Sequence, residues 1–97
     1  MKLSEMNAHQ REAYRWIMAS MSEFIGGYEN TMMDYPEDDE EYQTAKAFLS
    51  RPHDELIEFI YNDVMAGADK GMARHLRFAG TEWIKERISK RLTKWGY

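Results

Sequence analysis

The sequence predicts an all-α protein, a compact bundle of four or five helices forming a single domain over residues 1–97. Apolar residues recur at helical spacing along most of the chain, whereas no segment shows the alternation of apolar and polar residues that is typical of a strand. The two prolines, Pro36 and Pro52, stand where helices can begin. A chain of 97 residues can bury one modest core, and a second independent core is not expected.

The first helix is expected over residues 7–25. Asn7 and Gln10 have the spacing of a capping box, in which each side chain accepts a hydrogen bond from the backbone N–H of the other residue. Gly26 and Gly27 are expected to end this helix, because glycine readily adopts the left-handed conformation of a helix C-terminus. One apolar stripe repeats at helical spacing within it, formed by Tyr14, Ile17, Met18, Met21, Phe24 and Ile25.

Two shorter helices are expected in the middle of the chain. The second helix covers residues 37–49, because Pro36 suits a first turn, where its missing N–H has no partner within the helix. The third covers residues 51–66, with Ser50 as its N-cap and Gly67 as its stop. Apolar residues cover more than half of the circumference of this third helix, which predicts that it is the central helix of the bundle.

Residues 69–95 are expected to be helical, and two helices are favoured over one. Two apolar stripes follow one another, the first formed by Met72, Leu76, Ala79 and Trp83 and the second by Ile84, Ile88, Leu92 and Trp95. The stripes lie about 145° apart around the helix axis, and the change of face comes just after Gly80 and Thr81, where Thr81 is placed to cap a new helix. The alternative is one long helix whose second stripe is the seam of a homodimer.

Charge is distributed unevenly along the chain, although the net charge is only −4. Residues 23–63 carry twelve acids against two bases, and residues 69–97 carry eight bases against three acids. Such polarity indicates either that the two halves pair with each other or that each has its own partner.

The densest charge is an acidic run in which six of the eight residues from position 34 to position 41 are carboxylates. The spacing does not match a calcium-binding loop, which requires glycine at its sixth position, so no metal site is expected. Acids near a helix start are favourable without any function. The functional prediction is that this surface mimics nucleic-acid phosphates and occupies a basic surface of another protein. The predicted partner-binding carboxylates are Glu37, Asp38, Asp39, Glu40 and Glu41.

Trp16 and Tyr35 are the predicted aromatic anchors of this interaction, because aromatic side chains are enriched at interface hot spots. Trp16 lies roughly opposite the apolar stripe of the first helix. The same position is also suited to receive another helix of the bundle, and that second interpretation is the favoured one for Trp16.

The basic C-terminal helix is the alternative site. Four cations fall within about 100° on a helical projection, namely Arg87, Lys90, Arg91 and Lys94. This face predicts nucleic-acid binding as the second-ranked function, and pairing with the acidic half or with a second copy of the chain as further alternatives.

Catalysis and cofactors find little support in the sequence. The chain has no cysteine, which excludes disulfides and cysteine-based chemistry. The three histidines are far apart in sequence, and no phosphate-binding glycine loop or nucleophile motif is present. No signal-like N-terminal segment and no run of about 20 apolar residues occurs. A cytoplasmic protein without enzymatic activity, cofactor, metal or membrane contact is therefore expected.

In its small size, high methionine and aromatic content and lack of cysteine, the chain resembles accessory proteins of phages and mobile elements, a resemblance that assigns no role to any residue. The leading interpretation is a small helical regulator or inhibitor that binds a basic surface of another protein through its acidic residues.

Overall fold

The computed structural model describes residues 3–97 and confirms the all-α prediction. Within this range the chain forms five α-helices, a short 3-10 helix η1 (Leu3–Glu5) and no strand. The α-helices are α1 (Ala8–Asp34), α2 (Glu40–Leu49), α3 (His53–Ala66), α4 (Lys70–Ala79) and α5 (Thr81–Lys94). The molecule is elongated, with principal extents of 47 × 25 × 20 Å.

Helix α1 begins as predicted but is longer than predicted. The capping box is present, with Gln10 N–H donating to Asn7 Oδ1 at 2.8 Å and Asn7 N–H donating to Gln10 Oε1 at 3.1 Å. The predicted end at Gly26 and Gly27 is wrong, since the helix continues to Asp34.

Tertiary contacts account for the extension of α1 beyond its two glycines. The Tyr28 ring stacks on the Phe48 ring of α2, with centroids 4.3 Å apart, and the Phe24 ring meets the same Phe48 ring edge-on at 5.6 Å. Aromatic pairs contribute about 0.5–1.5 kcal/mol each beyond their buried area. Two glycines in a helix interior cost about 0.5–1 kcal/mol each, so the aromatic cluster with α2 offsets their low helix propensity.

Alanine at positions 26 and 27 is therefore expected to stabilise the protein. Gly26→Ala and Gly27→Ala should each raise the free energy of unfolding by about 0.5–1 kcal/mol, because an added Cβ meets no atom within 4 Å at either site. Urea denaturation followed by circular dichroism measures this change. A loss of stability in both variants would instead indicate the left-handed helix end that the sequence predicts.

The starts of α2 and α3 also differ from the predictions. Residues 36–39 form a turn, in which Asp39 N–H donates to Pro36 O at 2.9 Å, and α2 begins only at Glu40 with Asp39 as its N-cap. Ser50 does not cap α3. It is the C-cap of α2, and its hydroxyl donates to Lys46 O at 2.7 Å, while Pro52 occupies the N-cap position of α3.

The predicted break of the C-terminal segment is confirmed at Gly80, where α4 ends and α5 begins. Gly80 has φ +93° and ψ 143°, a backbone conformation that L-residues rarely adopt. Thr81 is not the cap of the new helix, because it is already the first helical residue and Gly80 precedes it. The end of α3 at Gly67 is confirmed, with Gly67 in a right-handed conformation.

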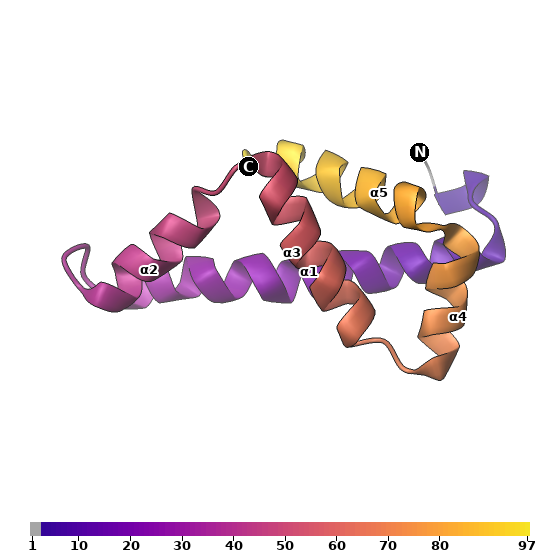
Figure 1. Cartoon of the computed structure of the whole chain (residues 1–97), viewed down its shortest axis with the longest axis horizontal. Helices are drawn as coiled ribbons and strands as arrows, with labels where there is room; N and C mark the ends of the chain where they lie inside the picture. The colour runs from indigo at the N-terminus through magenta and orange to yellow at the C-terminus, as the bar shows by residue number, and fades with distance from the viewer. Residues whose placement is uncertain (1–2) are drawn as a thin grey trace.

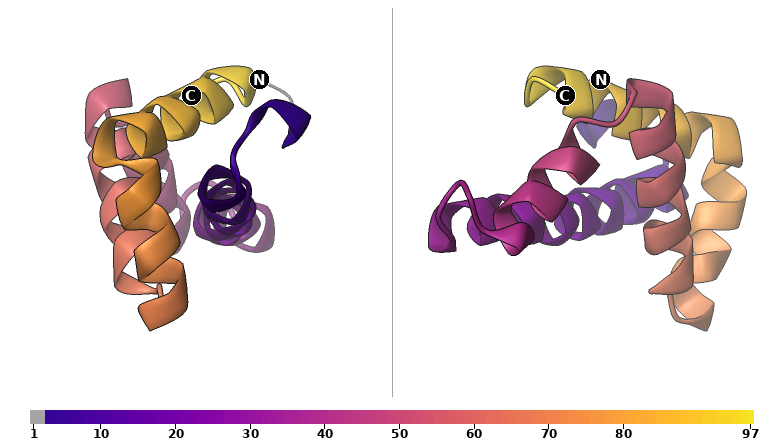
Figure 2. Two further views of the ribbon diagram at one scale, coloured as in Figure 1. Left: turned by 90° about the vertical axis from the view of Figure 1, so that its right-hand side faces the viewer. Right: turned by 60° about the vertical axis from the view of Figure 1, so that its left-hand side comes forward.

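Helix α1 is the centre of the bundle, and the prediction that residues 51–66 would be central is wrong. Helix α1 lies along the long axis, α2 packs against its C-terminal half, and α3 and α4 cross it steeply (Figure 1). Helix α5 lies above α1 in both views of Figure 2, and it packs against α1, α3 and α4. The broad apolar face of α3 is not wholly buried, because Phe59 remains 41% exposed.

Three of the four residues of the second C-terminal stripe are part of the core of a single chain, whereas Trp95 is 37% exposed. Ile84, Ile88 and Leu92 are at most 1% exposed and belong to the same buried cluster as Ile17 of α1 and Ile60 of α3. A homodimer therefore has no access to these three side chains as a seam unless the core opens. No helix within residues 3–97 combines the length and the apolar content that crossing a membrane requires.

Candidate functional site

The acidic tip, defined as Glu37, Asp38, Asp39, Glu40 and Glu41, lies where the chain turns from α1 into α2, at one end of the long axis (Figure 1). Asp39 has a structural role there, because its Oδ1 accepts a hydrogen bond of 2.8 Å from Glu41 N–H and so caps α2. Glu40 and Glu41 occupy the first turn of α2, where the helix dipole favours negative charge.

The carboxylates of the acidic tip face solvent. Glu37, Asp38, Glu40 and Glu41 are exposed, and Asp39 is partly buried. Among residues 3–97, no lysine, arginine or histidine lies within 4.0 Å of any of these five carboxylates. The turn itself is held from within the chain, because the Gln43 side chain donates to Glu37 O. The tip thus presents five carboxylates on a turn whose backbone is fixed by hydrogen bonds and by the start of α2.

The two predicted aromatic anchors are not close together. Trp16 lies within α1, and Tyr35 is the C-cap of the same helix. The two residues are 19 positions apart, which corresponds to about 28 Å along the helix axis at 1.5 Å per residue. Tyr35 is 44% exposed and directly precedes the turn that carries the tip. Tyr35 therefore lies at the acidic tip, whereas Trp16 lies in the other half of the molecule.

Trp16 packs within the bundle. Its indole N–H donates to Val64 O near the end of α3 at 2.9 Å, and its ring lies beside Gly67. A Cβ at Gly67 would come within 3.3 Å of the Trp16 ring. The favoured interpretation of this position, a contact with another helix of the same bundle, matches the observed geometry.

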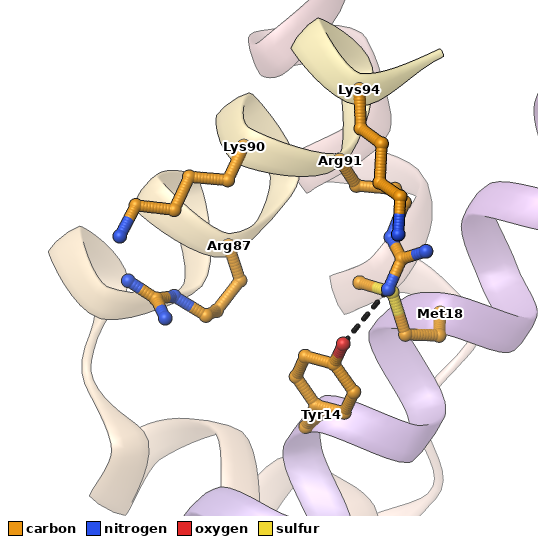
Figure 3. Close-up of a pocket in the computed structure, with 6 residues that line it drawn as sticks. All are labelled: Tyr14, Met18, Arg87, Lys90, Arg91 and Lys94. Carbon is orange, nitrogen blue, oxygen red and sulfur yellow. Dashed lines mark hydrogen bonds between the residues drawn. The ribbon is translucent and has the colours of Figure 1, made fainter. Parts of the chain in front are cut away.

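The four predicted cations of α5 line a small open pocket between α5 and α1, of about 140 Å³ (Figure 3). We call this the basic pocket, and its lining residues are Tyr14, Met18, Arg87, Lys90, Arg91 and Lys94. Arg91 Nη2 donates to the Tyr14 hydroxyl at 2.8 Å, which joins the two helices across the pocket. The α1 wall of the pocket was not predicted, because Tyr14 appears in the sequence only as a member of an apolar stripe.

Arg87 differs from the prediction of an exposed basic face, since its side chain is only 6% exposed. Its guanidinium lies over the Trp83 ring at 5.4 Å and donates to Glu86 at 2.8 Å, and its Nε–H is buried without an acceptor among the described residues. A hydrogen bond from Lys90, together with the charges of Arg87 and Lys90, lowers the pKa of the Glu86 carboxyl. Glu86 therefore stays ionised and neutralises part of this side of the pocket.

The acidic and basic halves of the chain remain largely separate. One described ion pair joins them, between Lys85 of α5 and Glu58 of α3 at 2.6 Å. No ion pair links the acidic tip to the basic pocket within the described part of the chain. The molecule is therefore bipolar, with an acidic end and a separate basic pocket.

His53 and Ser89 form a contact that the sequence did not reveal. His53 Nε2 lies 2.7 Å from Ser89 Oγ, and His53 Nδ1 lies 3.1 Å from Tyr97 O. The carbonyl can only accept, so in the neutral imidazole Nδ1 donates to it and Nε2 accepts from the serine hydroxyl. A serine paired with an oriented histidine is also the arrangement of an activated nucleophile. The contact ties α3, α5 and the end of the chain together.

The remaining two histidines also meet. His9 Nδ1 and His75 Nδ1 are 3.0 Å apart, and the His9 ring stacks on the exposed Phe78 ring at 4.5 Å. In residues 3–97, no three histidine, aspartate or glutamate side chains are grouped so that they could hold a metal ion.

Tyr97 anchors the last turn of the chain to α1. Its hydroxyl donates to Glu29 Oε2 at 2.8 Å, and its backbone N–H donates to Leu92 O at 2.9 Å. Partial burial and the hydrogen bond to Glu29 raise the pKa of the Tyr97 phenol to about 12. The hydroxyl therefore remains a donor throughout the physiological pH range.

Comparison with known protein families, with curated proteins and with solved structures found no match to this chain.

Proposed function

We propose that this protein is a small, non-enzymatic regulator or inhibitor that binds another protein by placing its acidic tip on a basic surface. The target is a surface of the kind that accepts nucleic-acid phosphates, so that the tip acts as a phosphate mimic. Action in the cytoplasm and an origin in a phage or mobile element are part of the same proposal.

The observation that supports this proposal most directly is the absence of any cationic partner within 4.0 Å of the five tip carboxylates, among residues 3–97. Like charges on five consecutive residues repel one another, because salt screens such repulsion only beyond a Debye length of about 8–10 Å. A basic partner surface relieves that repulsion and steers the encounter. Because Asp39 and Gln43 already fix the turn, little backbone conformational entropy is lost when the tip binds.

Nucleic-acid binding through α5 is the second candidate, and the basic pocket is the observation that favours it. Proteins whose duplex binding depends strongly on salt make about 6–10 phosphate contacts. On α5, Arg87 is buried and Lys90 is paired with Glu86 at 3.3 Å, which leaves Arg91 and Lys94 as the cations without a carboxylate partner among the described residues. Two unpaired cations are enough to contact a single phosphate group, but they are too few for an extended nucleic-acid interface.

A five-carboxylate variant tests the proposal: Glu37→Gln, Asp38→Asn, Asp39→Asn, Glu40→Gln and Glu41→Gln. Asparagine at position 39 preserves the cap of α2, because Asn and Asp are comparable N-caps. The wild-type protein is used to capture its partner from a nuclease-treated host lysate, and the partner is then purified. We expect the variant to lose binding to that partner, and duplex DNA to compete with the wild-type protein for it, while circular dichroism shows an unchanged helix content.

A matched control removes five carboxylates from elsewhere on the surface: Glu23→Gln, Asp54→Asn, Glu55→Gln, Asp63→Asn and Glu82→Gln. Both variants change the net charge equally, so the control should retain most of the binding. Equal loss in the two variants would show that overall charge, and not the tip, determines the interaction. Full binding by the five-carboxylate variant would overturn the proposal.

A further inference from the structure

The basic pocket is a second charged surface of the molecule, separate from the acidic tip. Its lining cations follow one face of α5 at positions 87, 90, 91 and 94, which is the spacing that brings side chains onto one side of a helix. In Figure 3, Arg91 and Lys94 extend toward α1, where Tyr14 and Met18 form the opposite wall. Two helices that are distant in sequence thus build one concave, positively charged surface.

The charges lining this pocket are not balanced within the fold. One carboxylate, Glu86, contacts Arg87 at 2.8 Å and Lys90 at 3.3 Å. Arg91 and Lys94 have no carboxylate within 4.0 Å among the described residues. Four cations against one adjacent carboxylate leave an excess of positive charge, and an anion in the pocket would lower that repulsion.

The donors at the pocket are held in place before any ligand binds. The Tyr14 hydroxyl positions Arg91 at 2.8 Å, and the Arg91 guanidinium also lies 6.0 Å from the centre of the Trp95 ring. Because the Tyr14 oxygen accepts from Arg91, its own O–H remains available to donate. Arg87 adds a buried Nε–H that has no acceptor among the described residues.

We propose that the basic pocket binds a phosphate dianion, as inorganic phosphate or as a terminal phosphomonoester. Arginine and lysine both recognise phosphate, arginine through paired N–H groups and lysine as a point charge. One water needs about 10–15 Å³ of such a cavity, and the 140 Å³ of the pocket has room for a tetrahedral anion of five heavy atoms. The pocket recognises one doubly charged phosphate group. A nucleic-acid-binding surface instead contacts a row of singly charged phosphodiesters along the backbone.

Isothermal titration calorimetry of the full chain with inorganic phosphate at low ionic strength tests the site. We expect saturable binding with a Kd of about 1 mM or tighter. In the double variant Arg91→Gln and Lys94→Gln, the affinity should fall by about tenfold to a hundredfold, because charge-assisted hydrogen bonds are lost. The control variant Lys70→Gln and Arg77→Gln removes one lysine and one arginine from exposed positions of α4 and should bind phosphate as the wild type does.

Two single-stranded oligonucleotides of the same sequence, one with and one without a 5′-phosphate, distinguish a monoester from the backbone. Tighter binding of the phosphorylated strand supports the proposal, and its preference should disappear in the Arg91/Lys94 variant. Equal binding of both strands would overturn the assignment to a monoester and would favour a backbone-binding surface. Absence of saturable phosphate binding, or equal weakening in the control variant, would overturn the site itself. Lys94→Gln alone keeps the Arg91–Tyr14 contact and serves as the second variant if the double variant is unstable.

Discussion

Replacing Ile88 by alanine is expected to lower the free energy of unfolding by about 2–5 kcal/mol. The Ile88 side chain is fully buried in the cluster that joins α1, α3, α4 and α5. Its truncation removes apolar contacts and leaves a cavity that close-packed helices fill only in part. A domain of this size is stable by about 5–15 kcal/mol, so the variant loses a large fraction of its stability.

Equilibrium unfolding in urea measures this loss as a shift of the midpoint at unchanged slope. Met33→Ala is the control, because Met33 is 81% exposed and its truncation should change stability by no more than about 0.5 kcal/mol. If the stripe of Ile84, Ile88 and Leu92 were instead the seam of a dimer, the midpoint would rise with protein concentration. A concentration-dependent midpoint, or a loss below about 1 kcal/mol in the Ile88 variant, would contradict the burial of this stripe within one chain.

Replacing Gly80 by alanine is expected to lower the free energy of unfolding by about 1–3 kcal/mol, through backbone strain. Gly80 has φ +93°, and no atom would lie within 4 Å of an added Cβ, so a steric clash with neighbours contributes nothing. The residue also holds the junction of two helices, because its N–H donates to Leu76 O and its carbonyl accepts from Ile84 N–H, both at 3.0 Å. Strain at this position therefore opposes the change of direction between α4 and α5.

Gly71→Ala is the matched control for this prediction. Gly71 is the second residue of α4, and an added Cβ would come no closer than 3.5 Å to the Asp69 side chain, an ordinary van der Waals contact. This variant should gain about 0.4–1 kcal/mol, because alanine adopts the helical backbone there without strain and lowers the conformational entropy of the unfolded chain. Thermal and urea unfolding of the two variants should thus move in opposite directions. Equal stability of Gly80→Ala and the wild type would show that the helices join without the left-handed residue.

The acidic run and the basic helix could both be found in the sequence, because charge density along a chain needs no knowledge of its fold. Their surroundings could not. Asp39 caps a helix that starts three residues later than predicted. Arg87 is buried against the Trp83 ring, although it belongs to the most basic segment of the chain. Helical projection places side chains on a face, but only packing decides whether that face meets solvent or another helix.

The α1 wall of the basic pocket shows the same limit. Tyr14 lies 77 positions from Arg91 in sequence, and its hydroxyl binds the Arg91 guanidinium only because α5 folds back over α1. The contact between His53 and Ser89 likewise joins segments 36 positions apart. No local pattern encodes such pairs, so the sequence predicted neither a concave site nor its hydrogen bonds.

By itself the sequence determined the helical class, the capping box at Asn7 and the end of α3 at Gly67, and it favoured the break at Gly80 over one long helix. These features depend on local physics: the period of apolar residues, the hydrogen bonds of a cap and, at Gly80, the backbone freedom of glycine. Tertiary structure alone decided that α1 runs through Gly26 and Gly27, because the Tyr28 and Phe48 rings meet only after α2 packs against it. It also decided which charges remain unpaired, since the energy of a charge depends on neighbours that distant parts of the chain bring to it.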